Sequence, residues 1–254
     1  MRLCPNYKVS PIDVGNLYKM EKSLFGIPAS GMAELHRAAE VCKGSAQAIY
    51  ESGTLIPGEY FAIHHVAWFD FLAGLFYLCW VPVPLGFAFY LFFRKQYKWC
   101  LKFSWSFLLV NVIGFIIYYI HPATPPWYVM NYGFHLNLNT PGNAGGLARW
   151  DAMTHIPLFH LIYGENANVF AAVPSLHAAY LLITTYYAKR SHKPWYTVTL
   201  FAIICLGIWF TAVYAGHHYV LDIITGVLTG ITGILIAELG IYRIPKIRRF
   251  LESR

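Results

Sequence analysis

The sequence is poor in charge: only 12% of its 254 residues are Asp, Glu, Lys or Arg, whereas 57% are hydrophobic. About a quarter of the residues are charged in an ordinary soluble domain, so this composition indicates a membrane protein. Aromatic residues make up 18% of the chain. Many of them flank the apolar runs, as in the aromatic belts at membrane interfaces.

Cysteine is also sparse, with five residues and no C-x-x-C pair. The sequence therefore predicts neither a disulfide framework nor a zinc site. No apolar core follows Met1-Arg2, so no secretory signal is expected. No Walker loop or dinucleotide fingerprint is present, which argues against a nucleotide cofactor. We expect no metal, no cofactor and no nucleic-acid partner.

The first sixty residues are the polar part of the chain, with six basic and six acidic side chains. Apolar residues recur at helical spacing over 30–52 and predict one amphipathic helix there, too polar to cross a membrane. We expect residues 1–60 to form an N-terminal segment that lies on the membrane surface or covers part of the membrane domain. Residues 61–254 would form the transmembrane catalytic domain.

Five apolar runs are each long enough to cross ~30 Å of hydrocarbon at about 1.5 Å per residue. A kink is expected in the first run, at Pro82 and Pro84. The long loop 121–168, rich in Pro, Gly and Asn, joins the second and third runs. We predict an all-α, polytopic transmembrane bundle of five spans, or six if residues 1–60 hide another. The runs cover residues 67–93, 101–120, 170–188, 196–215 and 219–242.

Basic residues are concentrated in three connections, 94–102, 189–193 and 243–254, which hold twelve of the 19 Lys and Arg residues. With five spans, all three face one side, and the positive-inside rule makes that side the cytoplasm. The loop 121–168 then faces the non-cytoplasmic side. We expect a multi-pass protein of the bacterial inner membrane, with the Golgi membrane as the alternative.

Two histidines and an aspartate lie where the last two runs meet, in Tyr214-Ala-Gly-His-His-Tyr-Val-Leu-Asp222. If a helix begins near His218, then His218 and Asp222 are at i and i+4 on one face. The carboxylate can then fix the imidazole tautomer and leave the other ring nitrogen free as base or nucleophile. The alternative is a group of polar residues at the membrane interface. An aspartate within a transmembrane segment is costly, which favours the chemical interpretation.

A second histidine is expected at the same membrane depth, in Phe170-Ala-Ala-Val-Pro-Ser-Leu-His177. Pro174 fits a first helical turn, and Ser175 and His177 follow within one turn. Taken alone, the pair is a capping serine and an interfacial histidine. Together with His218, His177 makes a general acid beside a nucleophile.

Arg149 is the only basic residue in the loop 121–168. Its guanidinium could bind a phosphate through two parallel hydrogen bonds. The alternative is an internal ion pair with Asp151 or Glu165. We predict that Arg149, Ser175 and His217 contact substrate.

These motifs resemble those of the type 2 phosphatidic acid phosphatase superfamily, whose second and third motifs are similar to Pro174-Ser-Leu-His177 and His218-x-x-x-Asp222. The similarity is greater to the fungal-type inositol phosphorylceramide synthases. There Pro125-Pro-Trp-Tyr128 and Gly145-Gly-Leu-Ala-Arg149 precede those two motifs in the same order, and the resemblance covers roughly 119–226. The first superfamily motif, with its Lys and Arg-Pro, is not recognisable. Thr211 and Ala212 replace the Ser-Arg of the third. These departures leave Arg149 as the substitute cation.

The resemblance implies a metal-independent enzyme that works through a phosphohistidine. The expected donor is a phospholipid such as phosphatidylinositol, and the expected acceptor is a ceramide-like lipid. With water as the acceptor, the same site would be a lipid phosphatase. A proton-relaying transporter is the alternative from another class, but no inverted repeat is evident. The oligomeric state cannot be predicted from the sequence.

Overall fold

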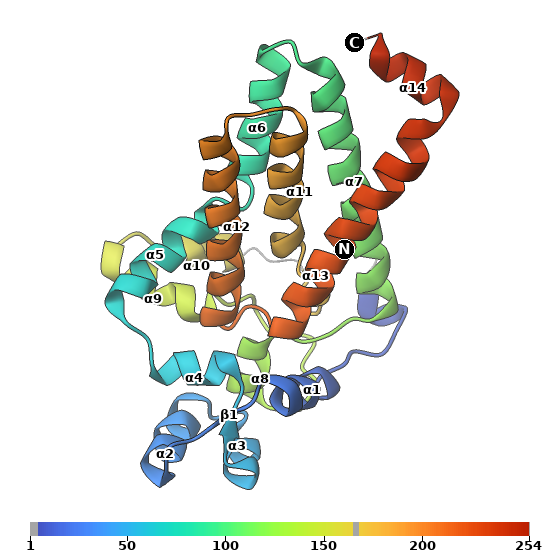
Figure 1. The fold of residues 1–254 in the computed structure, drawn as a ribbon. Helices are drawn as coiled ribbons and strands as arrows, with labels where there is room; N and C mark the ends of the chain where they lie inside the picture. Colours follow the sequence, from blue (N-terminus) through green and yellow to red (C-terminus); the bar gives the residue numbers. More distant parts are fainter. Residues whose placement is uncertain (1–4, 165–167, 254) are drawn as a thin grey trace.

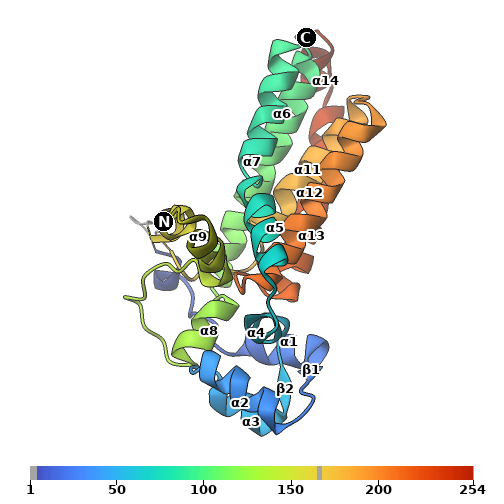
Figure 2. The ribbon, with the colours of Figure 1, turned by 90° about the vertical axis from the view of Figure 1, so that its left-hand side faces the viewer.

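The computed structural model describes residues 5–164 and 168–253, which form a bundle of long helices with a layer of short helices at one end (Figures 1 and 2). The bundle contains α5 (Ala67–Leu78), α6 (Pro82–Phe93), α7 (Tyr97–Ile120), α11 (Leu176–Arg190), α12 (Trp195–Tyr214) and α13 (Val220–Leu235). The C-terminal part continues with η3 (Ile236–Gly240), a π-helix, then η4 (Ile241–Arg243) and α14 (Pro245–Glu252).

The short helices come from the N-terminal segment and from the loop 121–168. The N-terminal segment contains η1 (Asn6–Lys8), α1 (Asn16–Phe25), α2 (Met32–Val41), α3 (Ala46–Ser52) and α4 (Pro57–Ile63). It also holds a small antiparallel sheet of β1 (Ile27–Pro28) and β2 (Thr54–Leu55). The loop contains α8 (Pro126–Tyr132), η2 (Gly145–Leu147), α9 (Ala148–Thr154) and α10 (Leu158–Gly164).

By length and composition, three or four of the five predicted spans qualify as membrane-crossing helices. Within the described residues, α7, α12 and the continuous stretch Val220–Arg243 are long and apolar enough to cross a membrane. The pair α5 and α6 would make a fourth span, bent by 40°. The predicted kink is confirmed, because α6 begins at Pro82.

The predicted span 170–188 supplies only α11, a helix of 15 residues. At about 1.5 Å per residue this is roughly 22 Å, short of ~30 Å of hydrocarbon. The first residues of the predicted span are instead extended, with a bridge between Ala123 and Ala171, and the helix begins only at Leu176. It nevertheless lies inside the bundle, packed against α7, α12 and α13.

The predicted single helix over 30–52 is wrong, because α2 and α3 are separated by a break around Gly44. Gly44 N donates to Met130 O at 2.8 Å. A Cβ on Gly44 would lie 2.3 Å from Gly133 N. The chain therefore breaks where it must approach the backbone at the end of α8.

Close packing of α13 on its neighbours fixes the position of its first turn relative to α11. Gly226, Gly230 and Gly233 of α13 each lie against a neighbouring helix or its start, where a side chain would be crowded. At Gly226 a Cβ would meet Ser175 O at 2.1 Å, and Ser175 N donates to Asp222 O at 2.9 Å. The beginnings of α11 and α13 are thus held together by backbone contact.

Candidate active site

The three predicted catalytic residues form one hydrogen-bonded chain. Asp222 Oδ2 lies 3.3 Å from His218 Nδ1, the i and i+4 arrangement that the spacing predicted. His218 Nε2 lies 3.1 Å from His177 Nδ1. If Asp222 accepts the proton of His218 Nδ1, the lone pair of His218 is on Nε2 and faces His177.

The start of α13 fixes Asp222 independently of the histidine. Asp222 Oδ2 also accepts the backbone N–H of Tyr219 at 2.9 Å, so the carboxylate caps its own helix. The next two N–H groups, of Val220 and Leu221, donate to the buried carboxylate of Glu21 at 2.8 and 3.2 Å. Helix capping and tautomer control therefore share one side chain.

Ser175 lies at the N-cap position of α11, as the capping alternative expected, but its side chain makes no capping bond. Among the described residues, Ser175 Oγ and Asp222 Oδ1 are buried polar atoms without a hydrogen-bond partner. A buried hydroxyl without a partner costs free energy. Ser175 Oγ, a possible donor, is therefore left without a partner next to the start of α11, which carries His177.

His217 lies beside the chain but points elsewhere. Its Nε2 lies 2.9 Å from Ala144 O, and its ring stacks on Tyr163 with centroids 4.4 Å apart. The ring of Tyr77 lies 5.6 Å from His217 and 5.2 Å from His177. His217 therefore connects the loop 121–168 to the turn between α12 and α13. These contacts give it a structural role, and its predicted contact with substrate stays a prediction.

Arg149 lies near the same turn, in an ion pair that the sequence did not predict. Its Nε donates to Asp70 Oδ1 at 2.6 Å, and the Tyr214 hydroxyl donates to the same oxygen at 2.9 Å. Gly146, three residues earlier, donates its N–H to Ala215 O at 2.8 Å. Arg149 Nη2 is buried and has no partner among the described residues. One guanidinium nitrogen thus remains for an anion.

The alternative prediction, an ion pair between Arg149 and Asp151, is wrong. The two carboxylate oxygens of Asp151 accept the N–H groups of Phe159 and His160 at 3.0 and 2.8 Å, at the start of α10. The other alternative, Glu165, lies outside the described residues. Asp151 is therefore a helix cap rather than a counter-ion.

Burial sets the charge state of the two adjacent histidines, which lie between the membrane-spanning helices. It lowers the pKa of His217 to about 3 and that of His218 to about 4, from an ordinary value of 6.5. Both rings are therefore neutral near pH 7. A neutral imidazole is the form that can act as a nucleophile.

The sequence did not predict the aromatic side chains around the three catalytic residues, nor the role of Glu21. Trp80 lies against His177, with ring centroids 4.5 Å apart. Tyr77 and Tyr163 were not predicted because single aromatic residues carry no signal in a chain that is 18% aromatic. Glu21 was not predicted because its contacts are with Val220 and Leu221, about 200 residues away. Asp70, the partner of Arg149, lies 79 residues away from it in the sequence, so no local pattern linked the two.

This architecture, with a histidine pair oriented by an aspartate at the end of a helical bundle, defines a class of membrane enzymes. The chain belongs to the PAP2 superfamily, whose family model matches residues 58–236. The predicted resemblance is confirmed. No solved structure was found to match the chain.

Within this superfamily, the chain is similar to several individual enzymes. The chain is 48% identical to the phosphoinositol dihydroceramide synthase of Bacteroides thetaiotaomicron over 252 residues, which is 99% of this chain and 76% of the relative. It is 31% identical to the inositol phosphorylceramide synthase catalytic subunit of Saccharomyces cerevisiae, over 46% of this chain and 29% of that protein. The corresponding synthase of Candida albicans is 27% identical, over 52% of this chain and 28% of its own length.

Proposed function

We propose that this protein transfers a phosphoinositol head group from phosphatidylinositol to a dihydroceramide-like lipid, through a phosphohistidine on His218. The observation that carries the proposal is the hydrogen-bonded chain from Asp222 through His218 to His177. The bacterial relative that matches nearly the whole chain is named for this transfer. The predicted phosphotransferase activity agrees with it.

In the first step, the donor's phosphate group binds between the rings of His218 and His177 and replaces their hydrogen bond. His218 Nε2 attacks phosphorus, and the P–O bond to diacylglycerol breaks. His177, protonated on both ring nitrogens beside the anionic phosphodiester, donates its Nδ1 proton to the departing glycerol oxygen and is left as a neutral imidazole. Asp222 stabilises the charge that develops on the His218 ring.

In the second step, His177 takes the proton from the acceptor's hydroxyl, and the hydroxyl oxygen attacks phosphorus. The P–N bond breaks and returns His218 to its neutral state. The buried donors Ser175 Oγ and Arg149 Nη2 stabilise the charge on the phosphoryl oxygens. No step uses a metal ion.

The site is proposed to face the non-cytoplasmic side of the membrane. The connections α6–α7 and α11–α12 and the helix α14, where the basic residues are concentrated, lie at one end of the bundle (Figure 1). The start of α13, with Asp222, lies at the other end. The positive-inside rule assigns the basic end to the cytoplasm, of a bacterial inner membrane if the chain shares the setting of its bacterial relative.

Residues 1–60 are proposed to support this site rather than to form an independent domain. Asn6 Nδ2 donates to Tyr118 O at 2.9 Å and to Phe170 O at 2.8 Å. Together with Glu21, these bonds attach the segment to α7, to the approach to α11 and to the start of α13.

The test uses purified protein in lipid micelles with head-group-labelled phosphatidylinositol, with and without dihydroceramide. Transfer predicts a labelled phosphoinositol lipid that forms only when dihydroceramide is present. Hydrolysis would instead release water-soluble inositol phosphate at the same rate in both samples. The second result would reassign the protein as a lipid hydrolase that uses water as the acceptor.

A further inference from the structure

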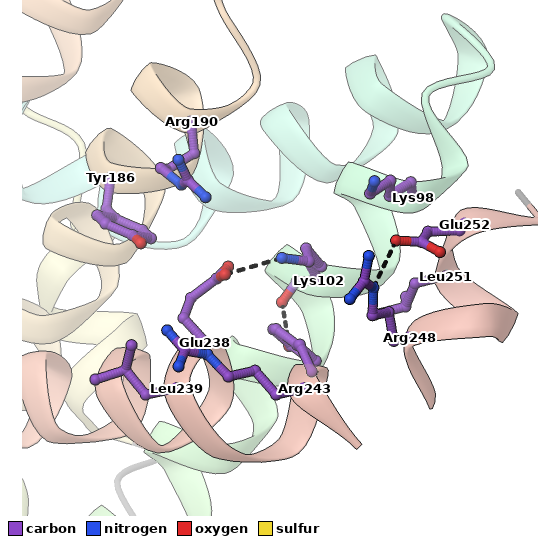
Figure 3. Close-up of a pocket in the computed structure, with 11 residues that line it drawn as sticks. Lys98, Lys102, Tyr186, Arg190, Glu238, Leu239, Arg243, Arg248, Leu251 and Glu252 are labelled. Carbon is purple, nitrogen blue, oxygen red and sulfur yellow. Dashed lines mark hydrogen bonds and ion pairs between the residues drawn. The ribbon is translucent and has the colours of Figure 1, made fainter. Parts of the chain in front are cut away.

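A charged cavity lies at the end of the bundle opposite the histidines, near α14 (Figures 1 and 3). Its volume is about 390 Å³, and three separate parts of the chain form its walls: α7, the end of α11, and the stretch from η3 to α14. Five basic and two acidic side chains line it: Lys98, Lys102, Arg190, Arg243, Arg248, Glu238 and Glu252. The lining therefore has an excess of three positive charges.

Both acidic side chains are already engaged. Glu238 accepts hydrogen bonds from Lys102 Nζ at 2.8 Å and from the Tyr187 hydroxyl at 3.0 Å. Glu252 pairs with Arg248 at 2.8 Å. These contacts neutralise two of the five cations and leave Lys98, Arg190 and Arg243 without an ion-pair partner among the described residues. Arg190 also lies over the Trp99 ring, with its Cζ 5.9 Å from the ring centroid.

The three remaining cations enter the cavity from different elements. Lys98 comes from α7, Arg190 from α11 and Arg243 from η4 (Figure 3). In the part of the chain that the structure describes, no carboxylate lies within 4.0 Å of their charged groups. Cations brought together from distant parts of a chain repel one another unless an anion lies between them.

An apolar groove adjoins the cavity. It has a volume of about 480 Å³ and shares Tyr242 and Leu251 with the cavity. Trp105, Leu109 and Val112 of α7 form one wall; its opposite wall is the apolar face of α14, with Ile247 and Phe250. A basic cavity that shares two lining residues with an apolar groove matches a molecule with an anionic head and a hydrocarbon tail.

We propose that the cavity and the groove together bind one anionic phospholipid of the cytoplasmic leaflet. Its phosphate lies among Lys98, Arg190 and Arg243, and one acyl chain lies along the groove. A zwitterionic lipid lacks the net negative charge that the three cations require, and free phosphate leaves the groove empty. The bound lipid would join α7, α11 and η4, and so stabilise the C-terminal part of the bundle.

The test measures lipid binding to the full-length protein in neutral detergent, by native mass spectrometry. Phosphatidylglycerol is expected to bind at least about tenfold more tightly than phosphatidylcholine. The double variant Lys98→Gln with Arg243→Gln should weaken phosphatidylglycerol binding by about 25-fold, at roughly fivefold per charge. Arg94→Gln with Arg249→Gln is the matched control: it removes the same charge near the same end of the bundle, outside both cavity and groove. It should change binding less than twofold.

A second arm tests the acyl chain. Val112→Trp fills the groove without touching the charged cavity, so it should weaken phosphatidylglycerol binding and leave the weak binding of glycerophosphoglycerol unchanged. The proposal is overturned if the control pair loses as much affinity as the cavity pair, because the attraction would then be diffuse. It is equally overturned if phosphatidylcholine binds as tightly, or if glycerophosphoglycerol binds as tightly as the intact lipid.

Discussion

At the residue scale, Asp222 has two roles that depend on the same oxygen atom. It caps α13 through the Tyr219 N–H and orients His218 through Nδ1. A substitution there changes both the start of the helix and the tautomer of the nucleophile. Its effects must therefore be separated from those of His218 itself.

We expect His218→Ala to abolish head-group transfer, because no other nitrogen occupies the position of its Nε2. Asp222→Asn should lower kcat by roughly 10²- to 10⁴-fold, since an amide does not enforce the required tautomer. His177→Ala should fail before the phosphohistidine forms, so no labelled protein should be trapped from labelled phosphatidylinositol. Normal turnover in His218→Ala would refute the mechanism.

Arg149 allows a sharper comparison now that its partner is known to be Asp70. If Arg149 holds the phosphoryl group, Arg149→Ala should lower kcat/KM by about 30- to several-thousand-fold, which corresponds to about 2–5 kcal/mol. Arg149→Lys should recover little, because lysine cannot donate two parallel hydrogen bonds.

The control for this prediction is Asp70→Asn, which weakens the ion pair but retains the guanidinium. It should keep most of the activity in well-folded, monodisperse samples. If Asp70→Asn loses as much activity as Arg149→Ala, and both proteins unfold at lower temperature, Arg149 only holds α9 against α5.

The pH dependence follows from the buried histidine. Because burial lowers the pKa of His218 to about 4, the nucleophile stays neutral as the pH falls from 7 to 5. The acid limb of kcat/KM should lie near pH 4 rather than 6.5. The folded protein also binds this proton less readily than the unfolded chain, so the stability that His218 contributes should fall as the pH drops from about 6.5 towards 4. A limb at pH 6.5 would mean that the ring is solvated.

At the scale of elements, the N-terminus of α13 is completed by a side chain from α1. Glu21→Ala would leave the partly buried N–H groups of Val220 and Leu221 without their side-chain acceptor, at up to about 1–3 kcal/mol each. We expect a lower melting temperature and a lower kcat, because the helix start that carries Asp222 loosens. Glu40→Ala, which removes an exposed acid of the same segment, should change neither.

Glu21→Gln separates position from charge. Burial raises the pKa of Glu21 to about 7, from an ordinary value of 4.5. The folded protein therefore holds this proton more tightly than the unfolded chain, and the stability that Glu21 contributes falls as the pH rises from about 4.5 to 7. The difference in melting temperature between wild type and Glu21→Gln should change across that window and become flat above it. An unchanged difference would mean that Glu21 does not titrate there.

At the scale of the whole molecule, the arrangement predicts which surface reaches each side of the membrane. Single cysteines at 94–98 and 189–193 should react with an impermeant reagent only from the cytoplasm, and cysteines at 140–144 only from outside. The measurement uses intact cells and inverted vesicles, in a background without reactive native cysteines. Labelling of both groups from one side would contradict the proposed orientation.

Local features of this protein could be predicted from its sequence. The apolar runs specified most of the bundle, the prolines at 82 and 84 specified the kink, and the i and i+4 spacing specified the pairing of His218 with Asp222. Each depends on hydrophobicity, backbone restriction or helix geometry within a few residues. The family could also be predicted from the sequence, because each of the four ordered motifs is a pattern within a few residues.

Contacts between distant segments were decided only by the tertiary structure. His177 and His218 are 41 residues apart, Arg149 and Asp70 are 79 apart, and Glu21 and Val220 are 199 apart. The bridge between Ala123 and Ala171, before the start of α11, is also encoded by no local pattern. Such pairings are fixed by how the helices pack, which depends on close approaches such as that of Gly226 to Ser175 rather than on the propensity of any single stretch.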